Sequence, residues 1–509
     1  MKQRITYLVP NPDDFHPDLL EVESASLSVR DLKAAKEHRL TLALSELPSE
    51  LRKAFEQWHE LHIRWASETP YSAPPPFTSR VSPGLHVFFT PQEDKSEGPI
   101  CALLREVFGQ EISCDDPQEA FTKLPILSER FSVSASSQFY AYVRSSAHFA
   151  QYVAERICPP SSTPCKAAAA SLNWASYIDI DYDAISHAII LNAFWARAPR
   201  SSGWSETTHL PGGQDTIEIG VLNHETNPDP EDIAFSGFLT VLGQDTKPKP
   251  TRFQTPTRHY PLPATHSKQT YTTSFQHPTG LHPTLIITLP TRHLQPPAET
   301  CKLHTYLTLP SYLFLDRYPF RDDPVFLSAH NIAGLRSLSG ATDLEAPDWV
   351  IGAWGSAALF EIAIPPSNKK QNTHLNVTIP LHLRYLPAQN ASHTRVPVPW
   401  PIVFWACNAE EGTKMSSNPF DRRHLGFEGL FGVRTRFVHV PPAISSGGDG
   451  NGKLVEWIDV PVLDLRGARW VEVGTVGAVV LAFLGICWVL FWGGSGKATR
   501  SVAREKKKQ

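Results

Sequence analysis

VGTVGAVVLAFLGICWVLFW, residues Val473–Trp492, is a run of twenty residues without a charged side chain. A helix needs roughly 20 apolar residues to cross a hydrocarbon core of about 30 Å. Backbone groups in lipid must be hydrogen-bonded within the segment, so an inserted run of this kind is helical. The alternative is a buried core helix, but such a helix is rarely apolar on all sides over this length. The sequence therefore predicts one transmembrane helix over residues 473–492.

The charges on either side of this run predict its orientation. Residues 493–509 carry six basic side chains against the single acid Glu505, whereas Arg466 and Arg469 before the run are balanced by Asp459, Asp464 and Glu472. Because positive charge stays on the cytosolic side, we expect the short tail in the cytosol. Residues 1–472 then lie in the lumen or outside the cell.

The last four residues of the sequence are Lys506-Lys507-Lys508-Gln509. Lysines three and four places from the end resemble a dilysine retrieval signal, which coat proteins read on cytosolic tails. Such a signal is an address read by a receptor, not an anchor. The alternative is a basic stop-transfer cluster. We interpret Lys506 and Lys507 as a signal for residence in the endoplasmic reticulum membrane.

The beginning of the sequence does not match this topology in an obvious way. MKQRITYLVPNPDDFHPD lacks the apolar core of 7–15 residues that marks a signal peptide. Either the C-terminal span directs insertion with the N-terminus outside, or the protein is tail-anchored with its bulk in the cytosol. The charge bias favours the first alternative.

Composition limits the class of the rest. A chain of 509 residues suggests two or three soluble domains plus the span. The formal net charge is −4, and the tail after Trp492 contributes +5, which leaves −9 on residues 1–492 and excludes the basic footprint of a nucleic-acid binder. There are 45 prolines, nearly 9% of the residues, against about 5% in average proteins. Prolines end helices and occupy turns and strand edges, so they favour β structure with long loops.

Cysteines and sequons agree with a lumenal bulk. Cys487 lies in the span, and an even set of six cysteines lies before it: Cys101, Cys114, Cys158, Cys165, Cys301 and Cys407. An even set on the lumenal side is compatible with disulfides, and Cys158 and Cys165 could close a small loop, although free buried thiols remain an alternative. Two sequons, at Asn376 and Asn390, also fall on the predicted lumenal side and predict glycosylation.

Alternating apolar residues predict a mainly β fold: lumenal β-sandwich-like domains with few helices, plus the C-terminal transmembrane helix. We divide the chain into an N-terminal domain of residues 1–242, a Pro/Thr-rich linker of residues 243–266, a β-sandwich domain of residues 267–472, the span and the basic tail 493–509. One soluble helix is expected near residues 48–67, because Leu51, Phe55, Trp58, Leu61 and Trp65 recur at steps of three and four.

One pattern suggests catalysis. Asp179-Ile-Asp181 matches the D-x-D spacing that holds a metal and a nucleotide sugar in many glycosyltransferases, because carboxylates at i and i+2 share one face of a strand. The same run is equally a strand with a solvated acidic face. It has no glycine-rich nucleotide loop beside it, so we favour the second interpretation.

The second half of the sequence contains a series of short sequence motifs, which we call motif pieces, in a characteristic order. They are Gly280-Leu-His-Pro-Thr-Leu285, Cys301-Lys-Leu-His304, Leu309-Pro310 with Phe314-Leu-Asp-Arg-Tyr318, Leu344-Glu-x-Pro-x-Trp349, Pro380-Leu-His-Leu-Arg-Tyr385, and then the single span. This series resembles the PIG-X family over about residues 270–495. The first 265 residues are typical of its fungal branch, the protease B non-derepressible proteins. The motif residues are Gly280, Leu281, His282, Pro283, Cys301, His304, Asp316, Tyr318, His382, Arg384 and Tyr385.

The resemblance implies a function that composition does not show. It implies a non-catalytic subunit of glycosylphosphatidylinositol mannosyltransferase I, which stabilises a membrane-embedded catalytic subunit of PIG-M type that adds the first mannose to the anchor precursor. No catalytic residue, cofactor or metal is then expected. A general chaperone of the endoplasmic reticulum and a glycosyltransferase using Asp179 and Asp181 remain the alternatives.

Several motif residues have more than one reading. His282, His304 and His382 lack metal-ligand spacing, so we interpret them as packing or hydrogen-bonding residues. Asp316-Arg317 could be a local ion pair or a partner contact. Cys301 and Cys407 could be bridged, but the sequence does not decide their pairing.

Overall fold

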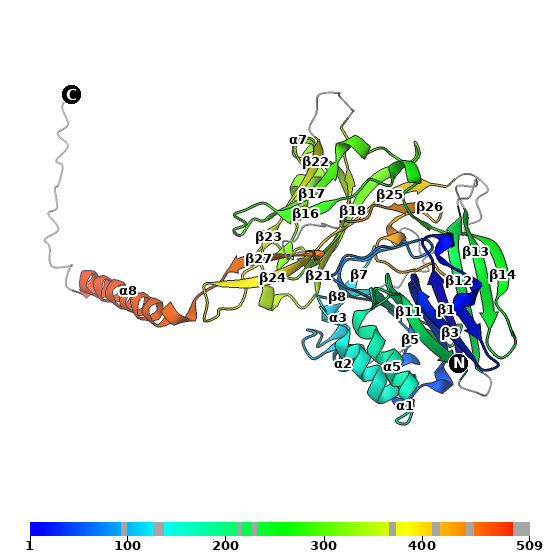
Figure 1. Cartoon of the computed structure of the whole chain (residues 1–509). Coiled ribbons are helices and arrows are strands. Elements are labelled where there is room, and N and C mark those ends of the chain that lie inside the picture. The colour runs from blue at the N-terminus through cyan, green and yellow to red at the C-terminus, as the bar shows by residue number, and fades with distance from the viewer. Residues whose placement is uncertain are drawn as a thin grey trace, which may run out of the picture.

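The computed structural model describes residues 1–92, 99–125, 137–210, 215–225, 232–365, 373–409, 418–443 and 452–491. Two β-rich lobes lie side by side, and one long helix leaves the second lobe (Figure 1). We call residues 1–256 the N-terminal lobe and residues 259–461 the C-terminal lobe. The prediction of a mainly β fold with few helices and one long apolar C-terminal helix is confirmed.

An eleven-stranded sheet forms the N-terminal lobe, and its neighbouring strands are antiparallel except for the parallel pair β1 and β12. In sheet order the strands are β14 (Lys249–Pro256), β13 (Asp232–Val241), β12 (Thr216–Glu225), β1 (Lys2–Leu8), β4 (Ala35–Ala43), β10 (Ala188–Trp195), β9 (Tyr177–Asp183), β5 (Trp58–Ala66), β6 (Gly84–Pro91), β8 (Ser137–Ala141) and β7 (Thr122–Lys123). A smaller sheet holds β11 (Trp204–His209), β3 (Ser26–Leu32) and β2 (Leu20–Val22).

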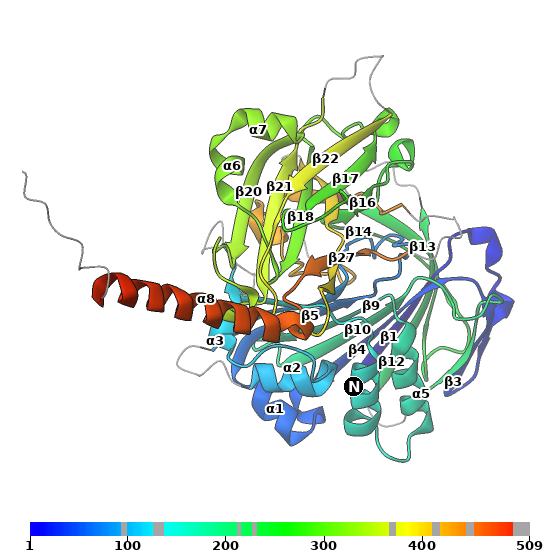
Figure 2. The same ribbon diagram turned by 90° about the vertical axis from the view of Figure 1, so that its left-hand side faces the viewer.

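Short helices gather beside the large sheet (Figure 2). They are α1 (Ser49–Phe55), α2 (Ile100–Phe108), α3 (Pro117–Ala120), α4 (Ala147–Tyr152) and α5 (Thr163–Ser171). Helix α2 buries Leu104 and Phe108 in the same core as the strands, so these helices help to cover the sheet.

The C-terminal lobe is a sandwich with additional short ladders. Its six-stranded sheet has the order β15 (His259–Tyr260), β26 (Thr435–His439), β25 (Ile402–Asn408), β18 (Lys302–Pro310), β21 (Gly355–Ile362) and β20 (Ile332–Gly340). The facing sheet holds β16 (Thr272–Phe275), β17 (Thr284–Pro290) and β22 (His374–Pro380). Two-stranded ladders pair β19 (Leu313–Phe314) with β23 (His382–Leu383), and β24 (His393–Pro399) with β27 (Val455–Pro461). Helices α6 (Arg317–Asp322) and α7 (Pro324–Ala329) precede β20.

The central strands of the six-stranded sheet, β18, β21 and β25, are buried on both faces. Successive residues of a strand point to opposite faces, and in β25 Val403 and Trp405 join the core of the sandwich, whereas Ile402 and Phe404 join the core of the N-terminal lobe. All four side chains are at most 5% exposed. The predicted sandwich therefore accounts for one face only, and the other face packs against the N-terminal lobe.

A segment of the second half completes this junction. Residues 418–430, which we call the crossing segment, lead from the C-terminal lobe onto the large N-terminal sheet. Phe420 enters the N-terminal core beside Phe77, at a ring-centroid distance of 5.8 Å, and the guanidinium of Arg4 lies 4.1 Å from the centre of the Phe420 ring. The carbonyl of Pro419 accepts hydrogen bonds from the side chains of Arg4 and Arg39. The two lobes thus share one interior.

The helix expected over residues 48–67 is wrong in its longer part. Helix α1 ends at Phe55, and Trp58–Ala66 is strand β5 in the middle of the large sheet. The register with β6 shifts between Trp58 and Glu60, so one extra residue lies between Trp58 and the next core residue, Leu61. The bulge therefore converts the two-residue period of a strand into a step of three that imitates a helix.

The predicted linker of residues 243–266 is also largely structured. Residues 249–256 form β14, and His259 and Tyr260 form β15, which pairs with β26. Proline is tolerated in β14 because this strand lies at the edge of the sheet, where one side of its backbone needs no partner. This stretch joins two sheets that belong to one packed body.

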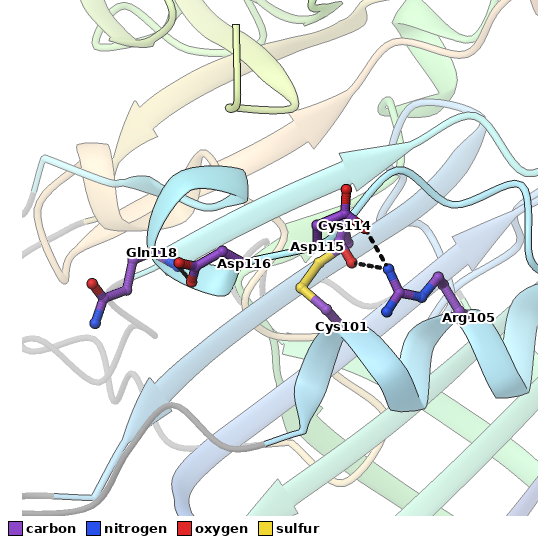
Figure 3. The surroundings of a disulfide bond; sticks show 6 residues. All are labelled: Cys101, Arg105, Cys114, Asp115, Asp116 and Gln118. Carbon is purple, nitrogen blue, oxygen red and sulfur yellow. Dashed lines mark hydrogen bonds and ion pairs between the residues drawn. A yellow bond between two sulfur atoms is a disulfide. The ribbon is translucent and has the colours of Figure 1, made fainter.

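Three disulfides join the six cysteines outside the span: Cys101 to Cys114, Cys158 to Cys165, and Cys301 to Cys407. The last of these links the beginning of β18 to the end of β25, within the sheet that both lobes share. Figure 3 shows the surroundings of the first, where Arg105 donates hydrogen bonds to the Cys114 carbonyl at 2.6 Å and to Asp115 Oδ1 at 2.7 Å. The disulfide and Arg105 together hold the loop after α2.

Helix α8 (Leu465–Phe491) has the length and the apolar composition needed to cross a membrane, and its apolar window is not buried within the protein. It begins eight residues before the predicted span, in a first part that carries Arg466, Arg469 and Glu472. Trp492, the tail 493–509 and the proposed retrieval lysines Lys506 and Lys507 lie outside the described residues.

We expect substitution of Gly355 by alanine to destabilise the shared sheet. Gly355 has φ = +143°, and a Cβ added there would lie 2.1 Å from the Leu309 carbonyl oxygen. Backbone strain and the lost β18–β21 contacts should lower the free energy of unfolding by about 2–4 kcal/mol. Denaturant titration of the purified full-length protein in detergent measures this. Gly432→Ala is the control, because a Cβ there would meet nothing within 4 Å; equal stability of the two variants would contradict the prediction.

Candidate functional site

The structure brings together three of the motif pieces that are far apart in the sequence. In the β19–β23 ladder, Phe314 pairs with His382 and Leu313 with Leu383. The backbone N–H of Leu383 donates to the carbonyl of Leu281 at 2.9 Å, which places the Gly280–Pro283 piece beside the same ladder. We call this group the motif cluster.

Arg384 connects the cluster to the loop between β20 and β21. Its side chain is 1% exposed and donates to the carbonyls of Ser311 at 3.0 Å and Ala346 at 2.7 Å. The guanidinium lies 4.4 Å from the centre of the Phe314 ring. Burial lowers the pKa of Arg384, although nearby carboxylates oppose this effect. Arg384 therefore fixes the position of the loop that carries Leu344 and Trp349.

The three motif histidines separate into two environments. His282 and His382 are hydrogen-bonded to each other through their Nδ1 atoms at 3.0 Å, and His382 stacks on Phe314. Burial, and then the neighbouring His282, lower the pKa of His382. His304 lies apart on β18, where its Nδ1 is bonded to the Lys302 carbonyl and burial lowers its pKa. Each ring has a packing and hydrogen-bonding role in its own environment.

Asp316 acts as a helix cap. Its Oδ1 accepts the backbone N–H of Tyr318 at 3.0 Å, at the N-terminus of α6. The guanidinium of Arg317 lies 5.3 Å from the centre of the Tyr318 ring, which is 53% exposed. The geometry thus gives Asp316 a local structural role and leaves Tyr318 on the surface.

Apolar side chains in the loops beside the motif cluster are exposed. We call the following group the motif surface: Leu344 (45% exposed), Trp349 (60%), Val350 (64%) and Tyr385 (64%). The backbone N–H of Asp348 donates to the carbonyl of Tyr385 at 3.0 Å, which holds the two parts of this surface together.

Backbone hydrogen bonds connect the motif surface to the beginning of α8. Gln389, four residues after Tyr385, donates to the carbonyl of Leu463 at 3.1 Å and accepts from the N–H of Leu465 at 2.8 Å. Leu463 is itself 60% exposed. The sequon residue Asn390 is exposed next to this junction, whereas Asn376 is exposed on β22. Sequence reasoning missed Val350 and Leu463, since a lone apolar residue in a loop carries no periodic signal.

The two aspartates of the D-x-D pattern are held in ion pairs at the lobe junction. Asp179 is 1% exposed, and Arg422 of the crossing segment binds both of its oxygens, Nε to Oδ2 at 2.6 Å and Nη2 to Oδ1 at 2.9 Å. Burial opposes the charge of Arg422, but Asp179 outweighs it and raises the Arg422 pKa. Asp181 is bonded to Arg64 and His62. Sequence reasoning missed this arrangement because Arg422, which binds both oxygens of Asp179, lies in the other half of the chain.

In the described residues, the fold and the motif surface define a disulfide-bonded β protein with one candidate membrane span and an exposed apolar surface next to the beginning of that helix. The chain belongs to the PIG-X / PBN1 family, whose sequence model matches residues 278–491. It is similar to "Protein pbn1" of Emericella nidulans, with 46% identity over 96% of this chain and 95% of the relative. The identity to "Protein pbn1" is 42% in Aspergillus fumigatus, over 100% and 99% of the two chains, and 42% in Neurospora crassa, over 96% and 95%.

Removal of the Arg422 guanidinium should strongly destabilise the protein. Arg422→Met leaves Asp179 buried without its bidentate partner, and loss of one member of a buried ion pair costs about 3–5 kcal/mol. Arg423→Met is the matched control, since its side chain is exposed and its carbonyl still accepts from Arg64. Thermal unfolding of the two full-length variants measures the difference. A decrease of the unfolding temperature by the same amount in both variants would show that loss of the Arg422–Asp179 pair is not the cause.

His86 should make the stability of the junction depend on pH. This ring is 1% exposed and hydrogen-bonded to the Ser82 carbonyl, and burial lowers its pKa from 6.5 to about 4. The pKa of His86 is lower in the folded state than in the unfolded state. The free energy of unfolding therefore has its full value above pH 6.5 and decreases as the pH falls toward 4. Between pH 7.5 and pH 5 the expected loss is about 2 kcal/mol.

The free energy of unfolding of the wild type and of His86→Gln, measured across this pH range, tests the prediction. The variant keeps a hydrogen-bond donor but does not titrate. Its free energy of unfolding should therefore fall by about 2 kcal/mol less than that of the wild type between pH 7.5 and pH 5. Parallel curves would exclude His86 as a source of the pH dependence.

Proposed function

We propose that this protein is a non-catalytic subunit of glycosylphosphatidylinositol mannosyltransferase I and stabilises the membrane-embedded catalytic subunit of PIG-M type, which adds the first mannose to the anchor precursor. The observation that carries the proposal is membership of the PIG-X / PBN1 family, whose relatives align over nearly the whole chain. Proteins of this family are in general accessory subunits without catalytic activity.

The proposed location is the endoplasmic reticulum membrane, with the lobes in the lumen and the tail in the cytosol. One span at the C-terminal end and three disulfides in the lobes support it, because disulfides persist in oxidising compartments. The exposed sequon residues Asn376 and Asn390 and the terminal lysines Lys506 and Lys507 agree with this topology.

The proposed partner contact is the motif surface together with α8. Both expose apolar side chains, and the hydrogen bonds of Gln389 hold them next to each other. Apolar residues in this position can cover a lumenal patch and a lipid-facing helix of the same partner. Binding only to the folded partner lowers its free energy by mass action and reduces the fraction open to degradation.

Two other functions lead to different observations. A general folding factor would also use an exposed apolar surface, but it would bind many clients, whereas a subunit binds one partner in fixed proportion. A glycosyltransferase using Asp179 and Asp181 would need these carboxylates open to a ligand. Asp179 is engaged with Arg422, and Asp181 with Arg64 and His62.

Trp349→Ser and Tyr385→Ser should each lower the amount of catalytic subunit that co-purifies with this protein by about tenfold, because exposed aromatic residues at the centre of an interface carry much of the binding energy. The half-life of the catalytic subunit in cells should shorten in parallel. Quantitative co-purification from detergent extracts, followed by a chase after synthesis is stopped, measures both effects.

Trp174→Ser is the matched control, because Trp174 is 53% exposed but lies in the N-terminal lobe. Unchanged binding in the Trp349 and Tyr385 variants would remove the motif surface from the proposed interface. An unchanged half-life of the catalytic subunit in cells that lack this protein would refute the proposed function itself.

A further inference from the structure

A second group of polar side chains lies at the lobe junction, apart from the motif surface. Glu60 and His62 stand two residues apart on β5 and therefore share a face of the strand, and His424 reaches them from the crossing segment. One carboxylate oxygen and one imidazole nitrogen of each histidine all lie within 4.8 Å of one another. Carboxylate and imidazole are ligands that proteins offer to divalent transition metals.

The orientation of His62 is fixed by a neighbouring carboxylate. Its Nδ1 is bonded to Asp181 Oδ1 at 2.7 Å, and Asp181 is held in turn by Arg64. The Nε2 atom therefore faces Glu60, whose Oε2 is 3.9 Å away. The His62 side chain is 8% exposed, and Nε2 has no hydrogen-bond partner among the described residues. A carboxylate behind the second ring nitrogen is the usual support of a metal-binding histidine.

The position of His424 is imposed by its surroundings. Its backbone has φ = +58°, a left-handed conformation that is uncommon for a residue with a side chain. Arg64 maintains it by donating two hydrogen bonds to the Arg423 carbonyl, from Nε at 3.1 Å and from Nη2 at 2.6 Å. As a result the His424 ring lies parallel to the His62 ring at a centroid distance of 3.6 Å.

We propose that Glu60, His62 and His424 form a binding site for a divalent transition metal, with zinc as the best match to a set of two imidazoles and one carboxylate. Water completes the fourth position of a tetrahedral site. In two parallel rings the nitrogen lone pairs point in parallel directions and do not converge on one ion. The His424 ring therefore rotates out of the stack when the ion binds, while the hydrogen bond to Asp181 keeps the His62 ring in place. The ion joins β5 to the crossing segment and cross-links the two lobes.

The test uses the full-length protein in detergent, stripped with a chelator and titrated with Zn²⁺, and with Co²⁺ as a spectroscopic probe. We expect one ion per chain, visible Co²⁺ bands typical of tetrahedral coordination, and a higher unfolding temperature with Zn²⁺. His62→Gln and His424→Gln should each weaken Zn²⁺ binding by at least about 100-fold, and Glu60→Gln by about tenfold. A metal-free stack of the two imidazole rings is the competing explanation.

His282→Gln is the matched control. It removes one ring of the other histidine pair and should leave the affinity for Zn²⁺ unchanged. The proposal is overturned if the stripped wild type takes up no stoichiometric Zn²⁺ and gains no thermal stability, a result that does not depend on whether the variants fold. It is also overturned if His424→Gln binds Zn²⁺ as tightly as the wild type.

Discussion

The structure depends on a sheet that is buried on both faces. In β18, β21 and β25, successive residues alternate between the core of the sandwich and the core of the N-terminal lobe. Neither lobe can close its interior without this sheet. The buried Arg422–Asp179 pair strengthens the same junction, because two desolvated charges are tolerated only in each other's presence. Polar contacts at the junction thus fix the relative orientation of the two lobes more specifically than apolar packing alone would.

The motif surface is held in place by hydrogen bonds within the second half of the chain. Trp349, Val350 and Tyr385 lie in loops, yet these loops are held by Arg384 and by backbone hydrogen bonds from Asp348 and Gln389. The same bonds connect them to the first residues of α8. An apolar surface held rigidly next to the long apolar helix α8 loses little entropy on binding, so a modest contact area can give a stable complex. The geometry therefore suits a permanent subunit better than a factor that samples many clients.

Sequence patterns predicted the parts of the fold that depend on local periodicity. Alternation predicted the mainly β character of the fold, and the uncharged run predicted the long apolar C-terminal helix. The helix expected over residues 48–67 is correct only as far as Phe55, because the bulge after Trp58 shifts the strand period of β5 by one residue. The shared interior of the two lobes was not predicted, because no local pattern shows that Ile402 and Phe404 are buried against the first half. The motif pieces were recognised by resemblance, but their assembly around Arg384, and the meeting of His62 with His424, depend on contacts between residues far apart in the chain.

The crossing segment also sets the order of events during synthesis. The large N-terminal sheet contains strands that all precede residue 257, but its interior is completed by Phe420 and Arg422, which are made more than 160 residues later. The N-terminal lobe is synthesised first but cannot finish folding on its own. Part of its apolar surface stays uncovered until the second half of the chain has been synthesised. Contacts over such separations slow folding and expose the chain to aggregation. A protein that we propose protects another from degradation thus itself passes through an incompletely folded, aggregation-prone state during synthesis.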